Sequence, residues 1–217
     1  MSSASGLTLL KKEEQNCMYT SSYGTGELIK DAINKGLTTI NLYIGGSATN
    51  DGGIGIASVL GFEFYDKFKK LLNPIGKNLV SIDFIDVGKI KFNFKKININ
   101  VICDVDNPLF GKNGAAFVYA SQKGAGSLDI NKLDQGLINL QSVLIKHDFP
   151  DVANIPGSGA AAILIGLMIS KGVVPGPFLF VDEKNLISLI FGGLIFTNIF
   201  LLCIGFFATN LFAKVTS

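Results

Sequence analysis

Apolar residues along the first two thirds of the chain recur at spacings that alternate between helical and strand-like. Residues 26–36 predict an amphipathic helix, because apolar residues recur on one face and Gly36 can end it. That face consists of Leu28, Ile29, Ala32 and Ile33. The polar stretch at residues 20–27 predicts a side-chain cap for this helix. Residues 38–44 are rich in β-branched and aromatic residues and predict a strand.

The pattern continues beyond a glycine-rich loop at residues 45–53, where residues 54–62 predict a short helix. Alternating apolar residues predict two further strands, one at 90–94 and one at 97–103. Residues 131–147 predict an amphipathic helix, because leucines recur at helical spacing. Strands that alternate with helices indicate an α/β fold and leave the sheet topology open.

Charge divides the 217-residue chain near residue 152. Before this point charged residues are frequent, and the N-terminus lacks the apolar segment of a signal peptide, so residues 1–154 predict a cytoplasmic α/β domain. After it, residues 186–213 are uncharged and apolar over more than the roughly 20 residues that cross a bilayer. Residues 155–217 therefore predict a membrane segment, in which glycines and prolines make residues 152–170 a short or re-entrant part.

Charge and composition exclude several classes of function. The net charge of +2 gives no basic surface of the kind that binds nucleic acid. The three cysteines lie far apart and match no metal-binding spacing. One histidine without a serine elbow gives little support to Ser–His–Asp hydrolysis.

The loop "GGSATNDGG" is the first candidate for chemistry, because a strand precedes it and a helix follows it. In α/β folds this order brings backbone N–H groups and a helix N-terminus to an anion. Glycines permit a close backbone approach, and Asp51 could hold Mg²⁺ or accept a hydroxyl proton. A flexible turn is the alternative. The candidate residues are Gly45, Gly46, Ser47, Thr49, Asn50 and Asp51.

Two further candidates follow the strand predicted at 97–103. Asp104, Asp106 and Asn107 fall at its C-terminal edge, where open α/β sheets place ligand-binding groups. Lys123, in "SQKGAG", could bind a phosphate or substrate anion. The alternatives are a solvated turn before Pro108 and a solvated lysine.

Several segments together resemble the glycerate kinase family of the glycerate 2-kinase type, in order and with near-family spacing over residues 1–161. The segments that carry the resemblance are "SSASGLTLL", "TSSYGTGELIKDAINKG", "NLYIGGSATNDGGIGIASVLGFEFYD", "VICDVDNPLFGKNGAAFVYASQKGA" and "PDVANIPGSGAA". The resemblance implies phosphorylation of D-glycerate with ATP and Mg²⁺. It implies catalytic roles for Asp51 and Asp104, with Asp51 also the metal ligand. The residues for which the resemblance implies binding of substrate or phosphate are Gly45, Gly46, Ser47, Thr49, Asn50, Asp106, Asn107 and Lys123.

Two family segments have no counterpart here, a "DSFKG"-like one and a "TGEGxxDxQ"-like one, so a truncated and inactive kinase is one expectation. Residues 155–217 resemble instead the large membrane subunit of tripartite tricarboxylate transporters, through "PGSGAAAILIGLMISKGVVPGP" and the apolar stretch that follows. A membrane fragment of such a transporter is therefore an alternative. Another is a chimeric reading frame that joins the two families at "IPGSGAA".

Overall fold

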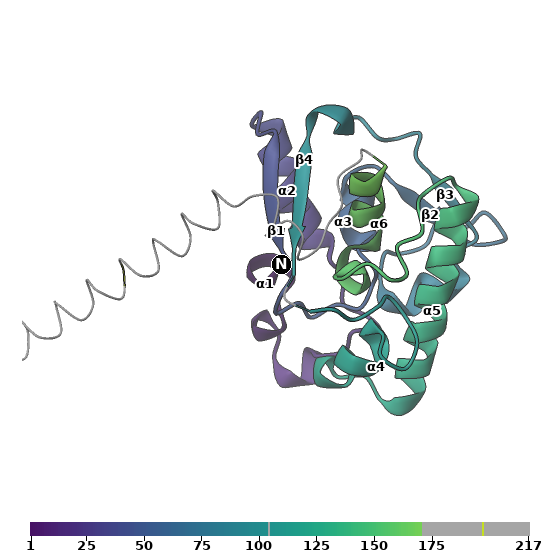
Figure 1. The fold of residues 1–217 in the computed structure, drawn as a ribbon. Helices are drawn as coiled ribbons and strands as arrows, with labels where there is room; N and C mark the ends of the chain where they lie inside the picture. The colour runs from purple at the N-terminus through teal and green to yellow at the C-terminus, as the bar shows by residue number, and fades with distance from the viewer. Residues whose placement is uncertain (104, 171–196, 198–217) are drawn as a thin grey trace, which may run out of the picture. The chain divides into compact units, whose positions relative to one another are not determined.

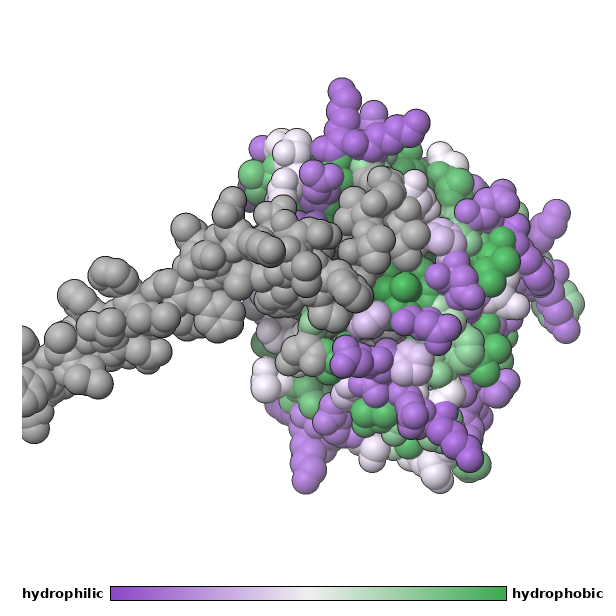
Figure 2. Space-filling model, viewed as in Figure 1, coloured by the Kyte–Doolittle hydropathy of each residue, from purple (hydrophilic) through white to green (hydrophobic). Residues whose placement is uncertain are grey.

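The computed structural model describes residues 1–103, 105–170 and 197 of the chain. All of them except Thr197 fall in one compact unit, Met1–Gly176. The unit combines strands with helices, so the α/β class expected from the sequence is confirmed for it. Hydrophilic side chains cover much of the face drawn in Figure 2, with smaller apolar areas between them.

A parallel pair of strands forms one side of the unit (Figure 1). Strand β1, Thr39–Tyr43, pairs with β4, Asn98–Ile102, in a register that sets Tyr43 opposite Ile102. The buried residues of β1 and β4 alternate with more exposed ones, as expected for strands that bury one face. Because the strands are parallel, the loops that follow them leave from the same edge.

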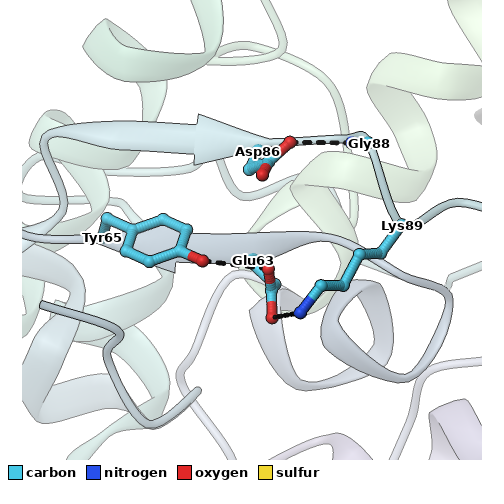
Figure 3. A network of polar contacts seen from close by, with 5 residues as sticks. All are labelled: Glu63, Tyr65, Asp86, Gly88 and Lys89. Atoms are coloured by element: carbon cyan, nitrogen blue, oxygen red, sulfur yellow. Dashed lines mark hydrogen bonds and ion pairs between the residues drawn. The ribbon is translucent and has the colours of Figure 1, made fainter. Parts of the chain in front are cut away.

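A short antiparallel pair, β2 (Glu63–Tyr65) and β3 (Phe84–Asp86), lies elsewhere in the unit. Figure 3 shows the polar contacts at its surface. Glu63 accepts a hydrogen bond from the Tyr65 hydroxyl at 2.9 Å and pairs with Lys89 at 2.8 Å. The Gly88 backbone N–H donates to Asp86 at 2.8 Å and closes the turn after β3. These contacts stabilise the end of the hairpin.

Six α-helices are described. Helix α1 is Ser2–Ser5, α2 is Tyr23–Asn34, α3 is Ile54–Val59, α4 is Ala115–Tyr119, α5 is Ser127–Lys146 and α6 is Ser158–Ile169. Short 3-10 helices are Leu7–Leu9, Lys12–Glu14, Gly76–Ser81, Phe94–Lys96 and Ser121–Lys123.

Two of these helices confirm the sequence pattern. Helix α2 ends as predicted, because Gly36 takes a φ of +83° and its N–H bonds to the Ile33 carbonyl at 2.9 Å. Helix α5 buries the predicted leucine face, consisting of Leu133, Leu137, Leu140 and Leu144. The α2 face is only partly as predicted: Ile29 is buried, whereas Leu28 points to solvent.

Helix α6 is a core element of the unit. Its residues from Ala161 to Ile165 are buried on every side, and it packs against β4 and α3. Ala161 has a φ of −150°, so the helix kinks there after its first turn. With twelve residues at 1.5 Å each, α6 is about 18 Å long, which is short of a bilayer core of about 30 Å.

The structure differs from the sequence predictions at two places. Residues 90–94 do not form a strand; Asn93 accepts a hydrogen bond from the Lys95 backbone N–H at 3.1 Å, which starts a 3-10 turn instead. Residues 152–170, expected to be a short or re-entrant membrane segment, contain the buried helix α6. The compact unit includes α6, and the domain boundary expected at 154/155 stays a prediction.

The apolar stretch at 186–213 lies outside the described residues, Thr197 excepted. Over residues 1–103, 105–170 and 197, no helix combines the length and apolar character that a membrane crossing requires.

Candidate functional site

A cavity of about 460 Å³ opens at the edge where β1 and β4 end. The segments that follow the two strands contribute Ile44 to Ser47 on one side and Val105 and Asn107 on the other. This is the edge at which open α/β sheets bind ligands. The lining is completed by Leu7, Thr8, Asn50, Ala115, Tyr119, Gln122, Lys123, Gly157, Gly159 and Ala160.

The glycine-rich loop after β1 is held by the N-terminal segment of the chain. The Leu7 N–H donates to the Gly46 carbonyl at 3.0 Å, and the Ala48 N–H donates to the Ser5 carbonyl at 2.8 Å. Gly46 takes a φ of +69°, which favours glycine at this position. A Cβ added to Gly45 would meet no atom within 4 Å, so open space adjoins the backbone there. A ligand can therefore approach this loop closely.

Lys123 is the cation of the cavity. It ends the 3-10 helix Ser121–Lys123, and its Nζ donates to the Ser47 hydroxyl at 2.9 Å and to the Thr49 carbonyl at 2.6 Å. No carboxylate of the described residues lies within ion-pair distance of it. Burial lowers the pKa of Lys123, and the nearby Cys17 and Asp51 offset part of that fall. An anion in the cavity would supply the missing counter-charge.

Asn50 and Thr49 carry buried polar atoms without a protein partner. Asn50 lines the cavity and is only 2% exposed, and its amide nitrogen has no hydrogen-bond acceptor among the described residues. The Thr49 hydroxyl is likewise unpaired there, although Thr49 does not line the cavity. Buried polar groups in proteins nearly always have partners, so the Asn50 amide is available to a water molecule or a ligand.

Asp51 lies beneath the cavity, fully buried, and does not line it. Its carboxylate accepts the backbone N–H and the hydroxyl of Ser22, each at 2.8 Å, and the Gly53 N–H at 3.1 Å. Burial raises the pKa of Asp51, while hydrogen bonds from Ser22, Gly53 and Gly55 act in the opposite direction. These contacts join the start of α2 to the start of α3.

The Ser22 hydroxyl donates to Asp51 and does not cap α2, although Ser22 is the N-cap residue. Its hydroxyl oxygen accepts the Ile56 N–H at 3.1 Å. The first turn of α2 is instead capped by Ser5, whose hydroxyl oxygen accepts the Thr25 N–H at 3.2 Å, so the cap predicted from residues 20–27 is wrong.

The residues after β4 divide between the cavity and solvent. Asn107 lines the cavity, where it accepts a hydrogen bond from the Tyr119 hydroxyl and donates to the Asn113 carbonyl at 2.9 Å. Asp106 is exposed and does not line the cavity. Asp104 lies outside the described residues.

Six of the predicted site residues thus meet at one cavity. They are Gly45, Gly46, Ser47, Asn50, Asn107 and Lys123. Their convergence depends on folding, since Lys123 and Ser47 are 76 positions apart. The catalytic roles assigned to Asp51 and Asp104 stay predictions.

The sequence analysis missed the first turn of α6 and the N-terminal segment as parts of the site. Gly157, Gly159 and Ala160 line the cavity, and a helix N-terminus carries partial positive charge that favours anions. A Cβ on Gly159 would lie 2.1 Å from the Ala115 Cβ, so only glycine lets α6 start this close to α4. The available signal was "PGSG", a glycine-rich turn before an apolar helix.

The described residues do not form a cluster of side chains that could bind a metal ion. No three His, Cys, Asp or Glu side chains come together over residues 1–103, 105–170 and 197. The Asp51 carboxylate is occupied by Ser22, Gly53 and Gly55. In this arrangement Asp51 does not fit a direct Mg²⁺ ligand.

Comparison with known proteins places these residues in a family. The Glycerate kinase family matches residues 1–179, and the Tripartite tricarboxylate transporter TctA family matches residues 152–217. The two matches overlap over residues 152–179, which include α6.

Individual relatives agree with the longer match. A glycerate kinase of Halalkalibacterium halodurans is 42% identical over 88% of this chain and 51% of its own length. A glycerate 2-kinase of Escherichia coli is 42% identical over 74% of this chain and 42% of its own length. The chain therefore spans about half the length of the curated relatives that it matches.

The fold agrees as well. The crystal structure of a protein assigned as glycerate kinase 2 from Salmonella typhimurium LT2 superposes with a TM-score of 0.73 at 35% identity. The superposition covers 81% of this chain and 47% of that one. The family match at residues 1–179 includes every described residue that lines the cavity, and the fold match agrees with it: the chain belongs to the glycerate kinase family.

Proposed function

We propose that this chain contributes a phosphoryl-transfer site that phosphorylates D-glycerate with ATP as the donor. The observation that carries the proposal is the cavity itself. It lies at the carboxyl edge of a parallel strand pair and is lined by Lys123 and Asn50; among the described residues no carboxylate pairs with Lys123 and no acceptor meets the Asn50 amide nitrogen. Curated relatives over this region carry the name glycerate kinase.

The lining suits the demands of phosphoryl transfer, in which the protein mainly positions groups and stabilises negative charge. Glycines at 45 and 46 let a ligand reach the backbone, and Lys123 supplies positive charge from a fixed position. The apolar residues Ile44, Val105 and Ala160 reduce the water around the reacting groups.

ATP in such enzymes is accompanied by Mg²⁺, which supplies charge neutralisation at the phosphates when bound. Because Asp51 does not fit a direct ligand, we derive no step through the metal. The role that we assign to Asp51 is to hold the loop between β1 and α3 in its cavity-forming conformation, through Ser22 and Gly53.

Product analysis tests the proposed reaction. The full chain is incubated with ATP, Mg²⁺ and D-glycerate, and ³¹P NMR follows the new phosphate ester. We expect a phosphoglycerate signal that requires both D-glycerate and the protein, and its coupling pattern identifies the hydroxyl that is phosphorylated. If the chain lacks segments that the reaction needs, it will be inactive, and no phosphate ester will form above the protein-free control. That result would contradict the proposed reaction.

A separate proposal concerns residues 152–217, because their match to the TctA family is independent of the kinase match. We propose that residues 186–213 associate this chain with a membrane while residues 1–154 stay on the cytoplasmic side. Alkaline carbonate extraction of membranes from cells that produce the full chain tests this. Recovery of the chain in the extracted soluble fraction would contradict it.

The joining of the two families in one reading frame can be tested directly on DNA. Long reads across codons 150–165 show whether one gene encodes both parts. Reads that separate into two genes would identify the chain as a chimera, in which only the kinase-like residues bear on the proposed reaction.

A further inference from the structure

Among the described residues, the cavity has a positive charge without a matching negative charge, and N–H donors without matching acceptors. Lys123 is the single charged residue among those that the structure describes in the lining, and no Asp or Glu faces it there. The remaining wall is largely glycine, alanine and aliphatic side chains, including Ile44 and Val105. In such low-dielectric surroundings an ion pair with a ligand is stronger than in water.

Lys123 and Asn50 offer buried or partly buried N–H donors to a ligand, beside the exposed side chains of Thr8 and Gln122 that also line the cavity. Lys123 has three N–H bonds, and two of them point to the Ser47 hydroxyl and the Thr49 carbonyl. One N–H therefore remains. The Asn50 amide nitrogen brings two more that have no acceptor among the described residues. Lys123 is held in place by its two bonds, so a ligand does not have to order that side chain.

We propose that Asn50 and Lys123 form the subsite that binds the carboxylate of the small hydroxy acid, an inference that rests on the proposed function. Three N–H donors can fill three of the roughly four lone-pair sites of one carboxylate, and one ammonium matches its single negative charge. A nucleotide triphosphate carries several negative charges, which one ammonium does not balance.

Calorimetric titration of the full chain tests the subsite with three probes: D-glycerate, glycerol as the analogue without a carboxylate, and ADP with Mg²⁺. The variants are Lys123→Met, which removes the charge, and Asn50→Asp, which places a negative charge against the ligand. Exposed residues give the matched controls, Lys132→Met on α5 and Asn34→Asp on α2.

We expect both site variants to bind D-glycerate at least tenfold more weakly and to bind ADP within twofold of the wild type. The controls should match the wild type with all probes. Weaker ADP binding with unchanged D-glycerate binding would overturn the proposal and assign Lys123 to a phosphate instead. Failure of the wild type to bind D-glycerate would overturn it as well.

A competition experiment on the wild type keeps the test independent of variant folding. Glycolate, which keeps the carboxylate and one hydroxyl, should displace D-glycerate, whereas glycerol should not. Displacement by glycerol alone would contradict a carboxylate subsite.

The outcomes separate this inference from the proposed reaction. If the variants bind D-glycerate more weakly but the wild type forms no phosphoglycerate, the subsite is supported and the proposed reaction is refuted. If the wild type forms phosphoglycerate and both variants keep their affinity for D-glycerate, the subsite is refuted and the proposed reaction stands.

Discussion

Asp51 gives the sharpest test of how the site is held together. Replacing it by alanine leaves the Ser22 N–H, the Ser22 hydroxyl and the Gly53 N–H without their acceptor in a fully buried place. Each buried unsatisfied donor costs about 1–3 kcal/mol, and local relaxation recovers part of the sum. We therefore expect Asp51→Ala to lower the free energy of unfolding by about 3–5 kcal/mol.

Asparagine keeps one acceptor oxygen but turns an N–H₂ group toward donors, so Asp51→Asn should cost about 2–3 kcal/mol. Asp66 provides the matched control, since it also accepts two backbone N–H bonds, from Phe68 and Lys70, each at 2.9 Å, but at the surface. Water can replace an exposed acceptor, so Asp66→Asn should cost less than about 1 kcal/mol.

Urea unfolding of the full chain in EDTA, followed by far-ultraviolet circular dichroism, measures the three variants against the wild type. The reasoning would be refuted if Asp51→Asn were no more destabilising than Asp66→Asn. If Asp51→Asn kept full stability in EDTA and lost only its response to Mg²⁺, the carboxylate would be a metal ligand after all.

Two further predictions follow from buried contacts. Burial raises the pKa of Cys17 to about 11, from an ordinary value of 9.0, so the folded state keeps the thiol proton that the unfolded state loses. The stability of the wild type relative to Cys17→Ala should therefore be constant below pH 9 and fall by about 1–2 kcal/mol between pH 9 and 11; a difference that stays flat over this range would contradict the shift. Gly159→Ala should destabilise the unit by about 1–3 kcal/mol, because the new Cβ would lie 2.1 Å from that of Ala115. Gly126→Ala, where a Cβ meets nothing within 4 Å, is its control, and equal urea midpoints for the two would count against the close approach of α4 and α6.

The local pattern of the sequence predicted the elements that carry the site. The leucines of α5 recur at helical spacing and are all buried, and the alternation at 97–103 yields β4. The strand, glycine-rich loop and helix around Gly46 also form in that order. In each case a repeating apolar pattern and a glycine at a turn act over a few residues, which is the range that sequence patterns describe.

Other features depend on contacts between distant residues. The bond from Lys123 to Ser47 and the bonds from Ser22 to Asp51 join segments far apart in the chain, and no local spacing signals them. The glycine-rich loop around Asp51 gave the basis for predicting a catalytic role, which stays a prediction, whereas the burial of its carboxylate depends on the packing of α2 against α3.

Helix α6 shows why composition alone misleads. A core helix buried on every side and a membrane helix both lack a polar face, so hydropathy does not separate them. Length and surroundings do: α6 has twelve residues and contacts β4 and α3. The same residues match both families, and in this structure they pack in the core of the compact unit.

The central claim is that the cavity around Lys123 is where D-glycerate receives a phosphoryl group. D-glycerate-dependent release of ADP from ATP, measured for the wild type, Lys123→Met and Lys132→Met of the full chain, tests it most directly. The account predicts equal release for the wild type and Lys132→Met. At D-glycerate concentrations below saturation it predicts a fall of about tenfold or more for Lys123→Met, because the acid loses the cation that binds its carboxylate. Release in Lys123→Met equal to that of the other two proteins would contradict the claim.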